Sequence, residues 1–394
     1  MKHEVKIVIG SAFGDEGKGV TVQYLCKEAI DGGKRPIVIR FSGGPQAGHT
    51  INLDGTEHIC STYGSGVLLG VPTLVYKTAY FDPLCAKREH DFLEDKMADV
   101  PGLYVCYDAK CITPYDVFHG RTDTKVLSDG TCGKGLFPTF KRYKDGCKTN
   151  FYSFVGNGLS IVKEYYEDWR MQCSEEMVKE IDEMMECEYN LFTKPEFRFI
   201  KAVSETDKFL EQFDVLIFEG SQGQLLDMDC GFYPNVTPSK VGLNGIEEKW
   251  LQDAEVYFVT RTYLTRHGNG YEPLTRCFDY IDLEGKHETN VLNTYQGHFK
   301  KGIINFDLLN EAFMRHNVDN KLRLYNMKAN LVVTHWDVLE KGNTFPYIMN
   351  GFHLQEYENA SELYSLFRYF PKTFKFNKMY INDSIESNLK LIEK

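Results

Sequence analysis

The chain has 394 residues, a formal net charge of −11, and 42% hydrophobic and 14% aromatic residues. This composition is sufficient for a packed core, and the negative charge argues against a general nucleic-acid surface. No apolar run reaches the length of a signal peptide or a transmembrane helix, so we expect no membrane contact. The eleven cysteines are scattered without CxxC pairs, which favours reduced thiols and a cytoplasmic location.

A short β-branched strand, residues 5–9, opens the chain and leads into a glycine-rich turn, Gly14–Gly19, and then a helix over residues 20–29. This order directs backbone N–H groups and a helix N-terminus toward a phosphate. The turn is not a Walker A loop, because no serine or threonine follows its lysine. Asp15 and Glu16 beside such a cradle indicate a magnesium ligand, a catalytic base or both. The alternative is a glycine-rich connection whose charges are merely solvated.

A second buried strand over residues 36–41 leads into another glycine-rich turn, residues 42–50. His49 stands in this turn between a glycine and a threonine, where a flexible backbone can expose it as a proton donor. The alternative is a structural or solvated histidine. Two glycine-rich turns that each follow a buried strand predict a parallel sheet with its loops gathered at the strand C-termini.

The remaining chain repeats this alternation of strands, polar loops and helices. Further strands are predicted over residues 103–107, 214–218, 255–260 and 330–334, and helices over 87–100 and, as two helices, over 158–192. The predicted turns and loops are a hairpin turn at 54–55, a glycine-rich loop at 128–135, polar loops at 219–229 and 265–270, and a basic loop at 293–302. The loop at 128–135 suits a phosphate, although a mobile surface loop explains its composition equally well. Without a linker or an internal repeat, the simplest architecture is one large α/β domain over residues 1–394, with a central, mostly parallel sheet flanked by helices.

Seven segments, taken in chain order, resemble the motifs of the adenylosuccinate synthetase family. They are GDEGKG at 14–19, AGHT at 47–50, GTCGKG at 130–135, FEGSQG at 218–223, YPNVT at 233–237, TRHGNG at 265–270 and THWDVL at 334–339. One such loop would be weak support for a resemblance to this family, whereas seven loops in the order of the family are highly specific. The resemblance implies the fold of that family and a homodimer.

The resemblance also implies a reaction. A C–N ligase of this family joins L-aspartate to C6 of a 6-oxopurine nucleotide, normally IMP, and hydrolyses GTP through a 6-phosphoryl intermediate to give adenylosuccinate. Asp15 would take the proton from purine N1, and His49 would act as general acid and charge stabiliser, with Gln222 as the third member of the catalytic set. Mg²⁺ would be held by Asp15 and the Gly48 carbonyl.

The family pattern further implies two sets of binding residues. The nucleotide and phosphate contacts would be Gly14, Glu16, Gly17, Lys18, Gly19, Gln46, Thr131, Cys132, Arg142, Ser221, Thr237 and Asp337. The contacts to L-aspartate would be Gln296, Gly297, His298 and Lys300. Asp337 would accept hydrogen bonds from the guanine of GTP, and Arg142 would reach the nucleotide of a neighbouring subunit.

Several departures from the family pattern leave alternatives open. Gln46 replaces an asparagine, Cys132 a threonine and His335 a lysine, and the guanine loop of the family is not recognisable at 381–384. ATP therefore remains an alternative phosphate donor. A Gln46 carbonyl could accept from the 2-amino group of a guanine base, for which Ser221 could leave room.

Two other functions compete with the IMP ligase. The first is a phage-type 2-aminoadenylosuccinate synthetase that uses GMP or dGMP, against which the retention of Asp15 favours IMP. The second is a GTP-binding switch without ligation, against which the catalytic pair and the candidate aspartate loop argue.

Overall fold

The computed structural model describes residues 3–128, 130–155, 158–193, 198–268, 295, 299–338, 346–351, 354–356, 360–384 and 388–392. Within these ranges, no helix combines the length and the apolar composition needed to cross a lipid bilayer. The predicted residues Gln296, Gly297 and His298 lie outside the described ranges.

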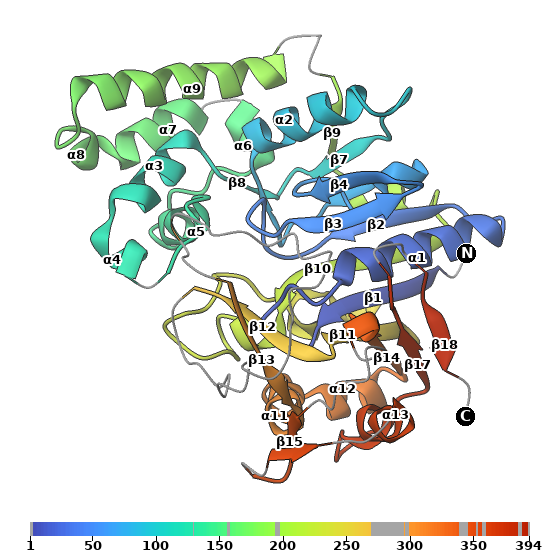
Figure 1. Ribbon diagram of the computed structural model, residues 1–394. Helices are drawn as coiled ribbons and strands as arrows, with labels where there is room; N and C mark the ends of the chain where they lie inside the picture. Colours follow the sequence, from blue (N-terminus) through green and yellow to red (C-terminus); the bar gives the residue numbers. More distant parts are fainter. Residues whose placement is uncertain are drawn as a thin grey trace.

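A ten-stranded sheet runs through the molecule (Figure 1) in the order β18-β17-β14-β11-β1-β10-β2-β5-β7-β9. Every neighbouring pair is parallel except β17 and β18. The predicted α/β class with a central, mostly parallel sheet is therefore confirmed. The strands are β1 Glu4–Gly10, β2 Pro36–Arg40, β5 Thr73–Val75, β7 Leu103–Cys106, β9 Ile200–Val203, β10 Val215–Gly223, β11 Glu255–Arg261, β14 Lys328–Thr334, β17 Lys378–Ile381 and β18 Lys390–Ile392.

Three smaller sheets accompany the large one. A four-stranded sheet contains β12 Tyr263–His267, β13 Phe299–Asn305, β15 Pro346–Ile348 and β16 Leu354–Glu356, and two-stranded sheets pair β3 His49–Leu53 with β4 Thr56–Cys60 and β6 Tyr80–Phe81 with β8 Lys110–Cys111. The predicted hairpin at Asp54-Gly55 is confirmed, because both residues have positive φ (49° and 82°), which a two-residue turn of this kind requires.

Helices surround the sheet. They are α1 Lys18–Asp31, α2 Pro83–Glu94, α3 Pro114–Thr122, α4 Thr124–Ser128, α5 Leu136–Lys144, α6 Phe151–Val155, α7 Gly158–Tyr165, α8 Glu167–Arg170, α9 Glu175–Thr193, α10 Thr206–Leu210, α11 Phe306–Arg315, α12 Val318–Leu324 and α13 Ala360–Tyr369. Short 3₁₀ turns are η1 Val67–Leu69, η3 Gln224–Leu226, η4 Leu243–Gly245, η5 Glu248–Trp250 and η6 Trp336–Val338. In Figure 1, α2, α3 and α6 to α9 gather at the top, and α11 to α13 gather at the bottom.

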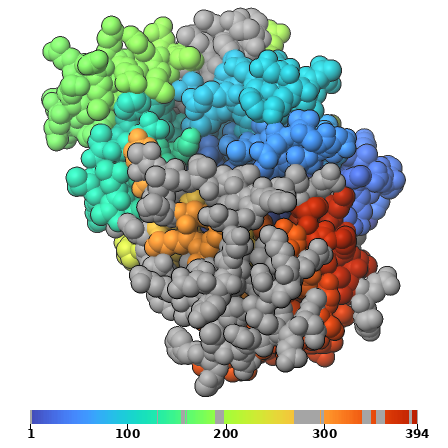
Figure 2. Space-filling model, in the orientation of Figure 1, coloured from blue at the N-terminus to red at the C-terminus, as the bar shows by residue number. Residues whose placement is uncertain are grey.

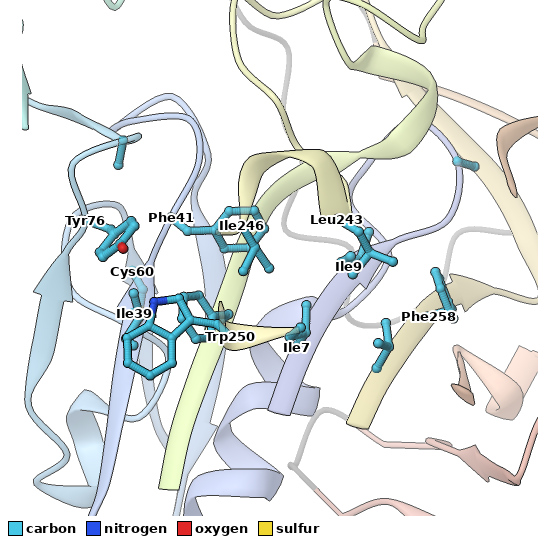
Figure 3. Packing of buried hydrophobic residues seen from close by; sticks show 14 of the residues in the cluster. Ile7, Ile9, Ile39, Phe41, Cys60, Tyr76, Leu243, Ile246, Trp250 and Phe258 are labelled. Atoms are coloured by element: carbon cyan, nitrogen blue, oxygen red, sulfur yellow. The ribbon is translucent and has the colours of Figure 1, made fainter. Parts of the chain in front are cut away.

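The central strands are buried on both faces. Ile7 and Ile9 of β1 belong to the larger apolar cluster, and Figure 3 shows them with Trp250 in that cluster. Val8, between them, belongs instead to a cluster with Val22 of α1. Successive strand residues point to opposite faces, so a strand covered on both sides reads as a continuous apolar run rather than an alternating one.

The C-terminal part of the chain returns to the first helix. Figure 2 shows red C-terminal residues meeting blue N-terminal ones at the right of the molecule. There, the ring of Tyr380 on β17 lies 6.1 Å from the ring of Tyr24 on α1, measured between centroids. The first helix thus packs against a strand from the C-terminal part of the chain.

Some predicted boundaries were wrong. The segment 158–192 contains three helices, α7 to α9, and the helix predicted over 87–100 begins at Pro83, because Asp82 caps it by accepting from the Cys85 amide at 2.9 Å. The segments 265–270 and 293–302 were predicted as loops, yet each contributes residues to an antiparallel pair, β12 with β13. Pairing between segments so far apart in the chain leaves no local signal.

Candidate functional site

Glycine-rich and polar loops meet where the central strands end. β1 lies between β10 and β11 in the large sheet, and open α/β sheets form their ligand crevices outside the carboxyl ends of such strands. A cavity of about 850 Å³ lies there. The sequence-predicted residues among its lining are Gly14, Asp15, Glu16, Gly17, Lys18, Gly19, Gln46, Gly48, His49, Thr131, Cys132, Ser221, Gln222, Thr237 and Asp337.

Backbone contacts hold the first loop at the cavity wall. Gly14 and Asp15 have positive φ values of 96° and 57°. The Gly14 carbonyl accepts from Thr265 Oγ1 at 3.0 Å, and the Asp15 carbonyl accepts from Arg261 Nε. The Asp15 carboxylate lies 3.4 Å from His267 Nε2 and remains 26% exposed. Because the neighbours bind the backbone carbonyls, the Asp15 side chain is positioned without being buried.

Glu16 stabilises this loop through buried contacts of its carboxylate. Its carboxylate accepts from the Ala12 amide and lies 3.4 Å from Lys18 Nζ, and both side chains are almost fully buried. Burial raises the pKa of Glu16, and Lys18 opposes that shift. Gly10 leaves room for the carboxylate, since a Cβ there would lie 1.9 Å from Glu16 Oε2. Glu16 thus positions Lys18 and the loop.

Two helices begin at the cavity without a side-chain cap. α1 follows Gly17 (φ 89°) and α5 follows Gly135 (φ 77°), both in the left-handed conformation. The N–H groups of an uncapped first turn bind anions, and the helix dipole favours negative charge there. Thr131 and Cys132 precede α5 and line the cavity. The site therefore has two places that suit phosphate groups.

His49 forms a buried pair with Glu219 of β10. His49 Nδ1 lies 2.6 Å from Glu219 Oε1. Burial alone would raise the pKa of Glu219, but Arg40, 3.9 Å away, and His49 lower it to about 2. The Ser65 amide also donates to Glu219 at 3.1 Å. Glu219 is therefore an ionised carboxylate that orients the imidazole.

The second ring nitrogen of His49 lies beside the cavity. Nε2 is 3.2 Å from the Ser221 carbonyl oxygen, which can only accept. Glu219 and this carbonyl are satisfied together only by the imidazolium, with a proton on each nitrogen. The pKa of His49 is lowered overall, because the effect of burial exceeds that of the Glu219 charge, which raises it. Without Glu219, the proton-donating form of His49 would be harder still to reach.

The side-chain amide of Gln46 is oriented by its own loop. Its Oε1 accepts from the Gly44 amide at 2.9 Å, which assigns the amide orientation. Nε2 is buried and has no partner among the described residues. The unpartnered group is therefore a donor, and acceptance by the Gln46 carbonyl from a guanine 2-amino group stays a prediction.

The segment at 381–384, not recognisable from sequence as a guanine loop, lies next to Asp337. Asn382 and Ser384 line the same cavity as Asp337 and His335. The Asn382 carbonyl accepts from the Trp336 amide at 2.9 Å, which ties the two loops together. The structure thus brings a polar wall to the end of β14.

Arg142 is not placed where its predicted role requires. Its side chain is fully buried, and Nη2 lies 2.9 Å from Asp116 Oδ2 and 2.9 Å from the Cys111 carbonyl oxygen. It does not line the cavity, and a guanidinium inside the protomer cannot reach a neighbouring subunit. Arg142 is a structural residue of the α3–α5 region, which corrects the prediction.

Replacing Arg142 with methionine is expected to lower the free energy of unfolding by about 3–5 kcal/mol, because the Asp116 charge would stay buried without its partner. The nucleotide KM of the folded fraction should not change. Lys144→Met is the matched variant, since Lys144 lies on the same helix, is exposed and lines the cavity. It should raise the nucleotide KM with little change in stability. Denaturant titration measures the stability of each variant, and steady-state kinetics measure its nucleotide KM. A raised KM with unchanged stability in Arg142→Met would show instead that Arg142 contacts the ligand.

Lys300 lies on β13, directly opposite Arg266 of β12. Arg266 lines the cavity, and its Nη2 donates to the Asn235 carbonyl at 3.3 Å. Lys300 is thus placed by a strand beside the site instead of by a loop.

A family model described as adenylosuccinate synthetase matches residues 7–345. The chain belongs to the adenylosuccinate synthetase family. Among its relatives, the adenylosuccinate synthetase of Chlorobium limicola is 29% identical over 69% of this chain and 64% of its own length. The synthetase of Bacteroides fragilis is 30% identical over 70% of the chain and 66% of its own length. That of Azobacteroides pseudotrichonymphae is 26% identical over 99% and 97%. The match to the Chlorobium protein thus spans less than two thirds of that relative.

Solved structures support the adenylosuccinate synthetase fold. The fully ligated adenylosuccinate synthetase of Plasmodium falciparum superposes with a TM-score of 0.75, at 18% identity, over 99% of this chain and 100% of that one. The succinoaminodeoxyadenylate synthetase of cyanophage S-2L, bound to dGMP and dATP, gives 0.64, at 14% identity, over 99% and 96%. At these identities the likeness concerns the fold.

The sequence of this adenylosuccinate synthetase family member did not reveal several residues that line the cavity or, like Glu219, support a residue that does. Glu219 belongs to the recognised FEGSQG segment, and Arg266 and His267 belong to the recognised TRHGNG segment. The motifs therefore included these residues but did not indicate what each one does. Arg261 and Asn382 carried no such signal. Their places depend on how β11, β14 and β17 end beside each other.

Proposed function

We propose that this protein is a purine nucleotide ligase that joins L-aspartate to C6 of IMP and hydrolyses GTP through a 6-phosphoryl intermediate, giving adenylosuccinate. The observation that carries the proposal is that Asp15 and the Glu219-oriented His49, from separate loops, line one cavity with two uncapped helix N-termini. Membership in a family of C–N ligases supports it.

The proton chemistry follows from the two side chains. Asp15 accepts the N1 proton of the purine, so that negative charge moves to O6. O6 attacks the γ-phosphorus of GTP, the bond to the β-phosphate oxygen breaks, and GDP leaves. His49 donates a hydrogen bond to the developing charge. The amine of L-aspartate then attacks C6, and phosphate leaves with O6.

The phosphate groups have matching places. The first turn of α1 with Lys18 suits the GTP phosphates, and the first turn of α5 with Thr131 and Cys132 suits the nucleotide phosphate. A site for Mg²⁺ fits the Asp15 carboxylate and the Gly48 carbonyl, because both are oxygen donors at the cavity wall and Mg²⁺ keeps water and phosphate as its other ligands. Bound there, Mg²⁺ would neutralise charge on the transferred phosphoryl group.

The hydrogen-bonding groups at the cavity can be compared with those of hypoxanthine and guanine to choose the acceptor base. The Gln46 carbonyl already accepts from the Gly44 amide, and its unpartnered group is the Nε2 donor, which suits a phosphate or a ring nitrogen and not the 2-amino group of guanine. Asp15 is retained as the N1 base. Gln46 and Asp15 thus favour IMP over GMP or dGMP. Gln222 Oε1, which is buried, lines the cavity and has no partner among the described residues, is an acceptor that suits a 2-amino group and supports the alternative.

The remaining contacts complete the proposal. Asp337 would bind the guanine of GTP, with Asn382 and Ser384 beside it, while Thr237 and Ser221 would bind IMP. L-aspartate would bind beside β12 and β13, near Lys300. We also propose one domain over residues 1–394, a homodimer and a cytoplasmic location, as in the family pattern.

Phosphate release measured with a panel of acceptors tests this proposal. IMP, dIMP, GMP and dGMP are each assayed with Mg²⁺, with GTP or ATP, and with or without L-aspartate. The expected result is aspartate-dependent release with the highest kcat/KM for IMP and GTP. A roughly tenfold preference for dGMP, about 1.4 kcal/mol in transition-state binding, would establish the phage-type reaction instead. Release independent of aspartate would indicate a GTP-binding switch.

A further inference from the structure

A cluster of metal-binding side chain types lies apart from the cavity, where the loop after η3 meets the C-terminal end of α11. Asp227, Cys230 and His316 each offer one ligand atom, and these atoms lie within 4.8 Å of one another. Asp227 and His316 are buried, and Cys230 is half-buried. None of the three lines the nucleotide cavity.

One ring nitrogen of His316 has an unused lone pair. Nε2 lies 2.8 Å from the Gln224 carbonyl oxygen and must donate to it. Nδ1 is therefore the acceptor of the neutral ring, and it has no hydrogen-bond partner within the described part of the chain, although the side chain is 1% exposed. A carbonyl that fixes one nitrogen of an imidazole is the usual support of a metal-ligating histidine.

The Asp227 carboxylate is fixed beside this nitrogen. Its Oδ2 accepts from the Val241 amide at 2.8 Å, and a Cβ on the next residue, Gly242, would lie only 2.4 Å from the imidazole Nδ1. Its Oδ1 accepts from the amides of Asp229 and Cys230, at 2.9 and 3.2 Å. Three backbone N–H groups hold the carboxylate in place, and among the described residues no cationic side chain forms an ion pair with it.

The third member of the cluster is the thiol of Cys230, the half-buried residue of the three. It forms no disulfide, and Asn244 Nδ2 donates to its sulfur at 3.8 Å. Two positive charges lie nearby and oppose a bound cation. The ammonium of Lys321 donates to Asn244 Oδ1, and Arg315 Nη1 donates to the Cys230 carbonyl at 3.3 Å.

We propose that Asp227, Cys230 and His316 form a Zn²⁺ site, in which one carboxylate oxygen, the thiolate sulfur and imidazole Nδ1 bind the ion and water takes the fourth position. A nitrogen, sulfur and oxygen donor set suits Zn²⁺, whereas Mg²⁺ prefers oxygen alone. The Cys230 proton passes to solvent on binding. Leu226 and Met228, on either side of Asp227, line the nucleotide cavity, so the ion would fix a loop of that cavity.

The test uses the full-length protein, stripped with a chelator and without nucleotide. Equilibrium dialysis against Zn²⁺ should give one ion per chain, and the ion should raise the melting temperature. Co²⁺ in its place should give the near-ultraviolet charge-transfer band of a cobalt–thiolate bond. Cys230→Ser should abolish that band and weaken Zn²⁺ binding at least tenfold. Lys321→Met should tighten binding, because it removes an opposing charge.

Matched controls separate this site from other thiols. Cys187→Ser changes an exposed cysteine on α9, and Cys60→Ser changes the buried cluster of His58, Cys60 and Glu89; neither should alter Zn²⁺ binding. Retention of one tightly bound ion and of the cobalt–thiolate band in Cys230→Ser would overturn the proposal, as would the absence of Zn²⁺ binding to the unsubstituted protein. Because Cys230 is half-buried, its serine variant is expected to fold, which its melting temperature verifies.

Discussion

Asp15→Asn is expected to lower kcat about 10²-fold or more, the scale of losing a positioned base, with no fall in melting temperature. The amide keeps the shape of the side chain but cannot accept the N1 proton. The contacts that hold the loop are made by the carbonyls of Gly14 and Asp15, so the substitution leaves them in place. Asparagine also tolerates the φ of 57° at this position.

Asp54→Asn is the matched control for this variant. Asp54 also has a positive φ, 49°, in a turn, but it does not line the cavity. Its substitution should leave both kcat and stability unchanged. Turnover near the unsubstituted rate in Asp15→Asn, measured as aspartate-dependent phosphate release, would remove Asp15 from the mechanism.

Glu219→Gln is expected to lower kcat/KM about 10- to 10²-fold and to move the basic limb of the pH profile to lower pH. The direction of this shift follows from the negative charge of Glu219. Ionised Glu219 raises the pKa of His49 against the effect of burial, so removing that charge lowers the pKa of His49. The imidazolium is then lost at a lower pH, and activity that needs it declines earlier as pH rises. Glutamine keeps the volume of the buried side chain.

Two comparisons show whether Glu219 acts through His49. In His49→Ala, adding Glu219→Gln should cost little more activity, because residues that work as a unit are not additive. Glu89→Gln tests a second buried carboxylate–imidazole pair, with Glu89 Oε1 3.1 Å from His58 Nε2 and both residues outside the cavity lining. It should leave the pH profile unchanged. An unshifted basic limb in Glu219→Gln would reduce Glu219 to a structural role.

The sequence by itself determined the order of strands and glycine-rich turns along the chain. Continuous apolar runs such as residues 5–9 and 36–41 indicated strands covered on both faces, and the glycine-rich turns after them indicated loops at one edge of a parallel sheet. These features are local, because strand burial and turn conformation depend on neighbouring residue types. Seven motifs in order were enough to indicate the family. The cavity brings Asp15 and His49 to one place, as that order implied.

Tertiary structure alone decided which side chains could act. Arg142 is a charged residue beside a glycine-rich loop, and its sequence position suggests a ligand contact. Burial against Asp116 makes it structural instead, because a buried charge must keep its partner. The free group of Gln46 depends on a contact with Gly44, and the pairing of Glu219 with His49 joins residues 170 positions apart. Such contacts arise only when the strands are assembled, so residue order and composition do not encode them locally.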